Sequence, residues 1–242
     1  MGETGNTMKT AGVVPCQAGW ISVTFDEGLQ HYKVLRGENE LSELFELTGR
    51  LFIHIPIGLC DDSYSRTCED LLKKELGEIA KDHIIHAPVR SVLHAPSYVE
   101  ASMQSLENTD QELSLQSWKL TPKIKIVDRL LRESEEVAEK VYESHPELLF
   151  TRLNGGVIYQ SKLTRKGLRH RLELVTSEEE IAADFFREIK EEFRRNEVGE
   201  EEILGAMALA YGAKASIQTR IRSLPDPPLV DSEGLRMAIY YI

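Results

Sequence analysis

The chain has 242 residues, of which 41% are hydrophobic, and its 29 Lys and Arg against 40 Asp and Glu give a formal charge of −11. This length and apolar content suit one large domain with a buried core. No apolar run is long enough to cross a bilayer, and residues 1–10 lack the basic and apolar regions of a signal peptide. The acidic balance disfavours non-specific binding of nucleic acid but leaves room for a local basic groove.

The termini and cysteines set further expectations. Residues 1–10 are expected to form a disordered tail, and residues 11–242 a single domain. The three cysteines, Cys16, Cys60 and Cys68, are odd in number and lack the paired spacing of a metal finger. We therefore expect a soluble, cytoplasmic protein with reduced thiols and no membrane contact.

The first part of the chain predicts strands. Three segments rich in apolar residues, 11–14, 20–25 and 31–35, predict an antiparallel meander with a hairpin turn at Glu27 and Gly28. Apolar residues at helical spacing predict a helix over 39–47. The run LFIHI then predicts a buried strand over 51–55 that ends at a turn.

The second part of the chain is mostly helical in pattern. Helices are expected over 65–76, 97–105 and 122–139, and a short strand over 140–144. Ser177 and Glu180 match a capping box that predicts the start of a helix, and a last helix is expected after Gly199. The segment LPDPP (224–228) predicts a rigid surface connection, and residues 235–241 an edge strand or a packed tail.

His54 lies inside the predicted buried strand, where an imidazole needs a polar partner. One interpretation is a core histidine that is hydrogen-bonded to backbone or water. The other is a site residue at the carboxyl end of the strand, where open α/β sheets bind their ligands.

Several short motifs, in order and at compatible spacing, resemble one family. They are CQAGW (16–20), IPIGL (55–59), APVRSVLHAPSYVEA (87–101), LSLQSWKLTPKI (113–124), HPE (145–147), LNGG (153–156), SKLTRKG (161–167), LPDPP (224–228) and GLRM (234–237). The family is the group labelled predicted RNase H-like nucleases, or domain of unknown function 429. The resemblance extends over nearly all of residues 11–241.

The resemblance implies an α/β, RNase H-like fold: a mixed five-stranded sheet of three antiparallel strands followed by parallel ones, with helices on both faces and a helical insertion. In this superfamily, carboxylates at strand ends and on a late helix hold two divalent cations, which activate water and stabilise the leaving oxygen in phosphodiester cleavage. The implied cofactor is Mg or Mn, because these ions prefer oxygen ligands. The implied substrate is nucleic acid.

Three positions depart from the family's pattern. Val14 stands where members carry the aspartate of an early glycine-valine-aspartate-glycine-cysteine run, and His54 stands where they have an aspartate before IPIGL. Gly205 replaces the aspartate of a late LDA run. Valine and glycine offer no ligand atom, and imidazole binds magnesium poorly. Hydrolysis is therefore expected to be weak or lost, unless Asp61 or Asp62 in the adjacent loop substitutes.

Three glutamates remain as candidates for a catalytic site. Glu143 lies two residues before the HPE motif, Glu147 ends that motif, and Glu202 precedes the altered position of the late helix. For Glu201 and Glu202 the alternative is an acidic first helical turn that the helix macrodipole favours. For Glu143, a carboxylate beside a buried strand end needs a partner of some kind.

A different metal site is possible if the first, fourth and fifth strands lie side by side. Cys16, His54, Cys60 and His145 would then follow or end strands at one edge of the sheet, and two thiolates with two imidazoles can bind zinc. The alternative is buried thiols without a metal, as expected for Cys68 in a helix.

The most basic stretch is SKLTRKGLRHR (161–171). Its cations recur every three or four residues and would share one face of a helix, either to contact phosphates or as a solvated surface. Two further cations lie in family-like motifs. The candidates for nucleic-acid contact are therefore Lys162, Arg165, Lys166, Arg169, Lys123 and Arg66.

The sequence leaves two functions open. The first is a metal-dependent nuclease with Glu143 and Glu202 as surviving ligands. The second is a non-catalytic protein of RNase H-like fold that binds nucleic acid, a nucleotide or a protein partner. The loss of three expected carboxylates favours the second.

Overall fold

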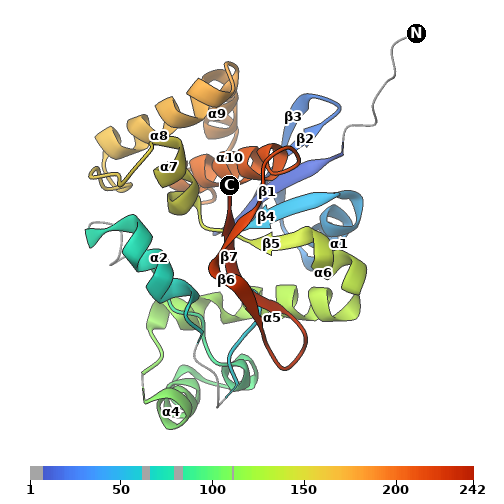
Figure 1. Cartoon of the computed structure of the whole chain (residues 1–242), viewed down its shortest axis with the longest axis vertical. Coiled ribbons are helices and arrows are strands. Elements are labelled where there is room, and N and C mark those ends of the chain that lie inside the picture. Colours follow the sequence, from blue (N-terminus) through green and yellow to red (C-terminus); the bar gives the residue numbers. More distant parts are fainter. Residues whose placement is uncertain (1–7, 62–65, 79–83, 111) are drawn as a thin grey trace.

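A mixed five-stranded sheet in the order β3-β2-β1-β4-β5 forms the centre of the computed structural model, which describes residues 8–61, 66–78, 84–110 and 112–242 (Figure 1). Strands β1 and β2 are antiparallel, as are β2 and β3, whereas β4 is parallel to β1 and β5 is parallel to β4. The strands are β1 (Thr10–Cys16), β2 (Gly19–Asp26), β3 (Leu29–Leu35), β4 (Arg50–Ile53) and β5 (Val141–Glu143). The predicted α/β fold is confirmed, and the arrangement is consistent with an RNase H-like sheet.

The β2–β3 turn shows why the meander forms. Glu27 and Gly28 have φ angles of 48° and 83°, and the flanking residues Asp26 and Leu29 pair directly. Positive φ at both central residues is the hairpin geometry whose twist matches that of the flanking strands. The turn predicted at these two residues is confirmed.

Helices cover both faces of the sheet. Ala11 and Val13 of β1 pack into one hydrophobic cluster, while Val14 packs into a second on the opposite face. The helices of the first cluster are α1 (Glu38–Leu47), α5 (Leu115–Glu133) and α6 (Glu135–Lys140). Those of the second are α2 (Cys68–Leu76), α7 (Pro146–Leu153), α8 (Arg165–Glu178), α9 (Ala182–Glu192) and α10 (Glu200–Ala215).

The predicted helical insertion lies between β4 and β5 (Figure 1). It contains α2, the 3₁₀ helix η1 (Arg90–His94), α4 (Tyr98–Thr109) and α5. A separate hairpin of β6 (Arg222–Val230) and β7 (Arg236–Tyr241) contacts α2 and touches the main sheet through a bridge between Ser144 and Tyr240. None of the helices in the described segments combines the length and the apolar content needed to cross a membrane.

Several boundaries differ from the prediction. Ser177 is not a helix N-cap: it lies inside α8, its hydroxyl donates to the Leu174 carbonyl, and the next helix begins at Ala182. The LPDPP segment lies within the bounds of β6, where Leu224 pairs with Ile239 and residues 225–228 form an unpaired irregularity before Leu229 pairs with Met237. Thr10, which was expected in the tail, already belongs to β1, and residues 1–7 of that prediction lie outside the described residues.

The helix expected to begin at Pro122 begins instead at Leu115 and carries the proline inside it. Proline has no N–H, so it leaves the Trp118 carbonyl without its backbone donor. The Thr121 hydroxyl donates to that carbonyl at 2.7 Å, which satisfies the acceptor. The helix therefore continues through a residue that usually ends one.

The closest contact between sheet and helix is at Gly12 of β1. A Cβ atom placed on Gly12 would lie 2.1 Å from the backbone nitrogen of Ala210 and 2.3 Å from the backbone oxygen of Ala206. Both neighbours are backbone atoms of α10, which cannot rotate away as a side chain can. Glycine at this position therefore sets how closely α10 packs on β1.

Replacing Gly12 by alanine should lower the free energy of unfolding by about 3 kcal/mol, at the upper end of the usual cost of overpacking. The matched control is Gly156→Ala, because Gly156 is exposed and a Cβ atom there meets nothing within 4 Å. Urea denaturation of both variants makes the comparison. Equal stability of the two would contradict the proposed role of Gly12.

Candidate functional site

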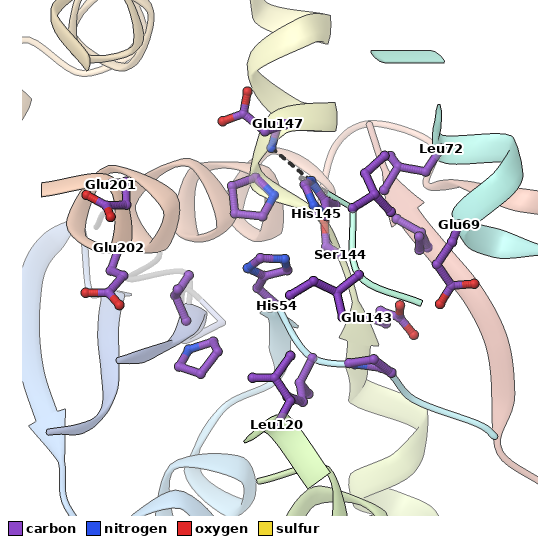
Figure 2. Close-up of a pocket in the computed structure, with 18 of the residues that line it drawn as sticks. His54, Glu69, Leu72, Leu120, Glu143, Ser144, His145, Glu147, Glu201 and Glu202 are labelled. Carbon is purple, nitrogen blue, oxygen red and sulfur yellow. Dashed lines mark hydrogen bonds between the residues drawn. The ribbon is translucent and has the colours of Figure 1, made fainter. Parts of the chain in front are cut away.

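A cavity of about 290 Å³ lies at the carboxyl ends of β1, β4 and β5 (Figure 2). Val14 of β1, His54 after β4 and His145 after β5 all line it. Apolar side chains from the insertion and from β7 form part of the wall, and glutamates from β5, α2, α7 and α10 form the rest. Open α/β sheets bind ligands at the carboxyl ends of their strands, and the cavity lies at that end, where the sequence predicted a site.

His54 and His145 meet at the centre of this cavity. Their rings are in edge-to-face contact with centroids 4.6 Å apart. The backbone N–H groups of His54 and Ser144 each donate at 2.9 Å, to the carbonyls of Val13 and Ile53, so the parallel ladder extends one residue beyond the strands. Both rings are half-buried and face the cavity, so His54 is a cavity residue and not a core histidine.

Both imidazoles are neutral at pH 7. Burial, with the nearby positive charge of Lys162, lowers the pKa of His54 to about 3. Burial also lowers the pKa of His145, as do His54 and Lys162. The Glu147 N–H donates to Nδ1 of His145 at 3.2 Å as an N-cap of α7, so the neutral ring carries its hydrogen on Nε2.

The three departures from the family pattern converge on this cavity. Val14 and His54 line it, on neighbouring strands. A Cβ atom placed on Gly205 of α10 would lie 3.3 Å from Cγ2 of Val14 and 3.2 Å from Cγ of Pro146. The positions that the resemblance gives to aspartates are therefore grouped together, and none of them carries a carboxylate.

Glu143 is held by a buried arginine. Its carboxylate accepts a hydrogen bond from the Ile57 N–H at 2.7 Å and pairs with Arg66. Arg66 also donates to Glu69 at 2.7 Å and to the carbonyls of Ile57 and Gly58. Burial raises the pKa of Glu143 to about 7. Arg66 opposes this shift, but its positive charge is shared with Glu69, whose negative charge also raises the pKa of Glu143. Arg66 is fully engaged and is not free to contact phosphate.

Glu147 is held by Arg171, a residue that the sequence analysis did not single out. Nε of Arg171 donates to one carboxylate oxygen at 2.9 Å and Nη2 to the other. Nη1 donates to the carbonyls of Gln160 and Gly167, both at 3.0 Å. Arg171 thus joins α7 to the loop that carries Lys162. The sequence feature that could have identified Arg171 is its spacing: it lies four residues before Val175, on the face of α8 that is otherwise buried and apolar.

Glu202 caps its own helix. Its carboxylate accepts from the Gly199 N–H, which closes the first turn of α10, and burial raises its pKa. Glu201 is exposed at the cavity rim. Both residues therefore fit the alternative of an acidic first turn that is stabilised by backbone N–H groups.

These donors do not fit a pair of Mg or Mn ions. Glu143 and Glu147 already bind guanidinium groups, and Glu202 binds its own backbone. Asp61 lies 3.8 Å from Arg90 and is not on the cavity wall, and Asp62 falls outside the described residues. Since the positions between them carry no oxygen ligand, the described residues offer no complete ligand set for two cations.

The four residues expected to bind zinc do not come together. Cys16 and Cys60 are buried in the hydrophobic core, where burial raises the pKa of both thiols, and neither lines the cavity. Across residues 8–61, 66–78, 84–110 and 112–242, no three His, Cys, Asp or Glu side chains are grouped closely enough to hold a metal ion. Only His54 and His145 of the predicted set are in contact.

The basic stretch divides into two parts. Lys162 precedes α8 and lines the cavity, whereas Arg165 and Lys166 are exposed on the first turn of the helix. The single helical face expected for all four cations was therefore wrong at Lys162. Arg169 is exposed and lies 3.4 Å from Glu173.

Lys123 has a structural contact in place of the expected phosphate. Its amine donates to the carbonyls of Cys16 at 2.6 Å and Gly19 at 2.7 Å, and it lies over the Trp20 ring. These bonds hold the β1–β2 turn against α5 and use two of the three N–H donors of the amine.

The family model described as "Protein of unknown function (DUF429)" matches residues 12–229. The chain belongs to the DUF429 family. No curated protein and no solved structure matches it. The DUF429 region runs from β1 into β6, so Val14, His54 and Gly205 all lie inside it. The altered cavity is thus part of the family domain and not of an appended segment.

Arg171→Met should lower the free energy of unfolding by about 3–5 kcal/mol, because it leaves Glu147 charged, buried and unpaired. Adding Glu147→Gln should recover much of that loss in the double variant. The control is Arg169→Met on the same helix, whose exposed pair with Glu173 should contribute less than about 1 kcal/mol. Urea denaturation measures all four proteins, and a double variant no better than Arg171→Met would contradict the pairing.

His54 should make the folded state of this DUF429 protein sensitive to acid. Its folded pKa lies below the unfolded value, so the unfolded chain binds more protons and stability falls as pH decreases from about 6.5 towards 3. Glu143, with a raised folded pKa, acts in the opposite direction between about pH 7 and 4.5. The test must therefore compare proteins that share Glu143.

Below pH 6, the free energy of unfolding of the parent should fall relative to that of His54→Gln by up to about 1.4 kcal/mol for each pH unit. Guanidinium denaturation at pH 7, 6 and 5 measures the difference. His31→Gln, at an exposed position of β3, is the control and should follow the parent. Parallel curves for His54→Gln and the parent would show that His54 is not held neutral.

Proposed function

We propose that this DUF429 protein has an RNase H-like fold without metal-dependent phosphodiester hydrolysis, and that it binds nucleic acid without cleaving it. The observation that carries the proposal is the state of the carboxylates. The three grouped positions hold Val14, His54 and Gly205, and the three candidate glutamates, Glu143, Glu147 and Glu202, each have an internal partner.

Hydrolysis by two cations needs several carboxylate oxygens that are free to bind metal. Removing Glu147 from Arg171 would leave a buried guanidinium unpaired, which costs several kcal/mol. Removing Glu143 from Arg66 would break one of the two ion pairs of that guanidinium. Metal binding here would therefore compete with the ion pairs that hold the cavity together. This competition supports loss of hydrolysis.

Binding of phosphate is supported by cations that have no internal partner. In the described part of the chain, Lys162, Arg165 and Lys166 make no ion pair within 4 Å. They follow one another from the cavity to the exposed first turn of α8. In a chain of charge −11, such a local group restricts phosphate binding to one place.

A cytoplasmic location belongs to the same proposal. The described structure leaves Cys16, Cys60 and Cys68 as free, buried thiols. Thiols of this kind suit a reducing compartment.

Binding is tested by the fluorescence anisotropy of a labelled single-stranded oligonucleotide in EDTA at several salt concentrations. The triple variant Lys162→Gln, Arg165→Gln and Lys166→Gln should bind more weakly, with a salt slope smaller by about 2, since each single-strand phosphate contact contributes about 0.7. The matched control, Arg187→Gln with Arg194→Gln and Arg195→Gln, removes the same charge from exposed positions elsewhere. No binding by the parent would end the proposal.

The same proposal predicts no cleavage of that oligonucleotide by the parent in Mg or Mn. The variant Val14→Asp, His54→Asp and Gly205→Asp should gain manganese binding that the parent lacks. At a manganese concentration 100 times Kd, ligand binding contributes about 2.7 kcal/mol, which should raise the Tm of the variant by about 5–10 °C. Cleavage by the parent that Glu143→Gln abolishes would contradict the proposed loss.

A further inference from the structure

The two ends of the cavity differ in chemistry. In Figure 2, Glu201 and Glu202 of α10 lie on one side of the histidine pair and Leu72 of α2 lies on the other. Lys162 belongs to the α10 side, because its charge acts on Glu202 and on both histidines. Apolar side chains that line the cavity, here called the Leu72 wall, are those of Leu72, Ile84, Ile85, Leu120 and Ile239. Two carboxylates, Glu69 and Glu143, also lie on the Leu72 side, and both are paired with Arg66.

The polar end has hydrogen-bond donors without acceptors. The amine of Lys162, both ring nitrogens of His54 and Nε2 of His145 make no hydrogen bond to any of the described residues. Each neutral imidazole has one N–H, and for His145 it is on Nε2. The carboxylates of Glu143, Glu147 and Glu202, by contrast, already accept hydrogen bonds. A ligand that matches this end must therefore bring acceptor oxygens.

We infer that the cavity binds a phosphate monoester joined to an apolar or aromatic body, with the phosphate at Lys162, His54 and His145 and the body against the Leu72 wall. A monoester has three non-bridging oxygens for donors from three places in the chain. The inference rests on the proposed function in one respect: the cavity holds no pair of catalytic cations.

The size of the cavity limits the ligand. A volume of about 290 Å³ is at the lower end of small-molecule sites, which run from about 300 to 1,000 Å³. One nucleotide unit fits this range, whereas a duplex does not. The ligand is therefore either a free nucleoside monophosphate or the phosphorylated end of a single strand, and both present the same chemistry.

Calorimetric titration in EDTA with AMP, adenosine and ribose 5-phosphate tests the two ends separately. AMP should bind at least about tenfold more tightly than either of the others, because each lacks one half of the ligand. Lys162→Gln should weaken AMP about tenfold, a loss typical of one charged contact. His145→Asn keeps an N-cap side chain and removes the Nε2–H, and it should weaken AMP as well.

Arg165→Gln is the matched control, because Arg165 is exposed and does not line the cavity. It should leave AMP affinity unchanged. AMP that binds no better than adenosine, or equally well to the parent and to Lys162→Gln, would overturn the inference. Circular dichroism of each variant establishes that it is folded.

Oligonucleotides with a 5′-phosphate or a 5′-hydroxyl separate this inference from the proposed function. Stronger binding of the phosphorylated strand, lost in Lys162→Gln, identifies strand ends as a source of the phosphate. AMP binding without that preference identifies the free nucleotide. Equal binding of both strands with no AMP binding would overturn the inference and leave the proposed function standing. AMP binding without binding of either strand would overturn the proposed function alone.

Discussion

The pairing of buried arginines with buried glutamates is the interaction on which the cavity depends. Arg171 donates to both carboxylate oxygens of Glu147, to the loop carbonyl of Gln160 and to the carbonyl of Gly167 in α8. One guanidinium therefore fixes α7, the start of α8 and the loop between them. His145 caps α7 through the Glu147 N–H, and Lys162 lies on the loop that Arg171 holds. Two of the three groups proposed to bind phosphate, His145 and Lys162, are therefore positioned by a single ion pair. Arginine suits this role because its planar fork stays charged and donates in several directions at once.

Arg66 does the same on the other side of the cavity, and the result changes what the glutamates can do. One guanidinium binds Glu69 and Glu143 and also two backbone carbonyls. Burial, with the nearby charge of Glu69, raises the pKa of Glu143 although Arg66 opposes the shift. A carboxylate held in this way orients the turn after β4 through the Ile57 N–H. The interactions of the Glu143 carboxylate stabilise the fold, and breaking them to bind a metal ion would cost free energy. We therefore assign no metal-binding step to Glu143.

Local patterns in the sequence were sufficient for the sheet and insufficient for the site. The β2–β3 turn has two residues of positive φ, Glu27 and Gly28. A glycine between two apolar segments indicates such a turn, so the meander was predictable. The position of His54 was also predictable, because an apolar run that ends at Pro56 places it at a strand end. Ser177 failed because its hydroxyl bonds within α8, where a local pattern has no information about what continues the helix. Arg171 and Glu147 are 24 residues apart, and nothing in either segment indicates that they pair.

The centre of the cavity consists of uncharged side chains. Five glutamates line the walls, and carboxylates at positions 14, 54 and 205 would add like charges that repel unless metal binds between them. Valine, a neutral imidazole and glycine remove that repulsion, and Val14 lies so near Gly205 that a Cβ atom placed there would be 3.3 Å from its Cγ2. Burial holds the two histidines uncharged, which leaves Lys162 as the cation that faces them both. An anion that enters the cavity meets the positive charge of Lys162 and two imidazole N–H donors. These groups are already in position, so they can replace the water molecules that the anion loses on entry.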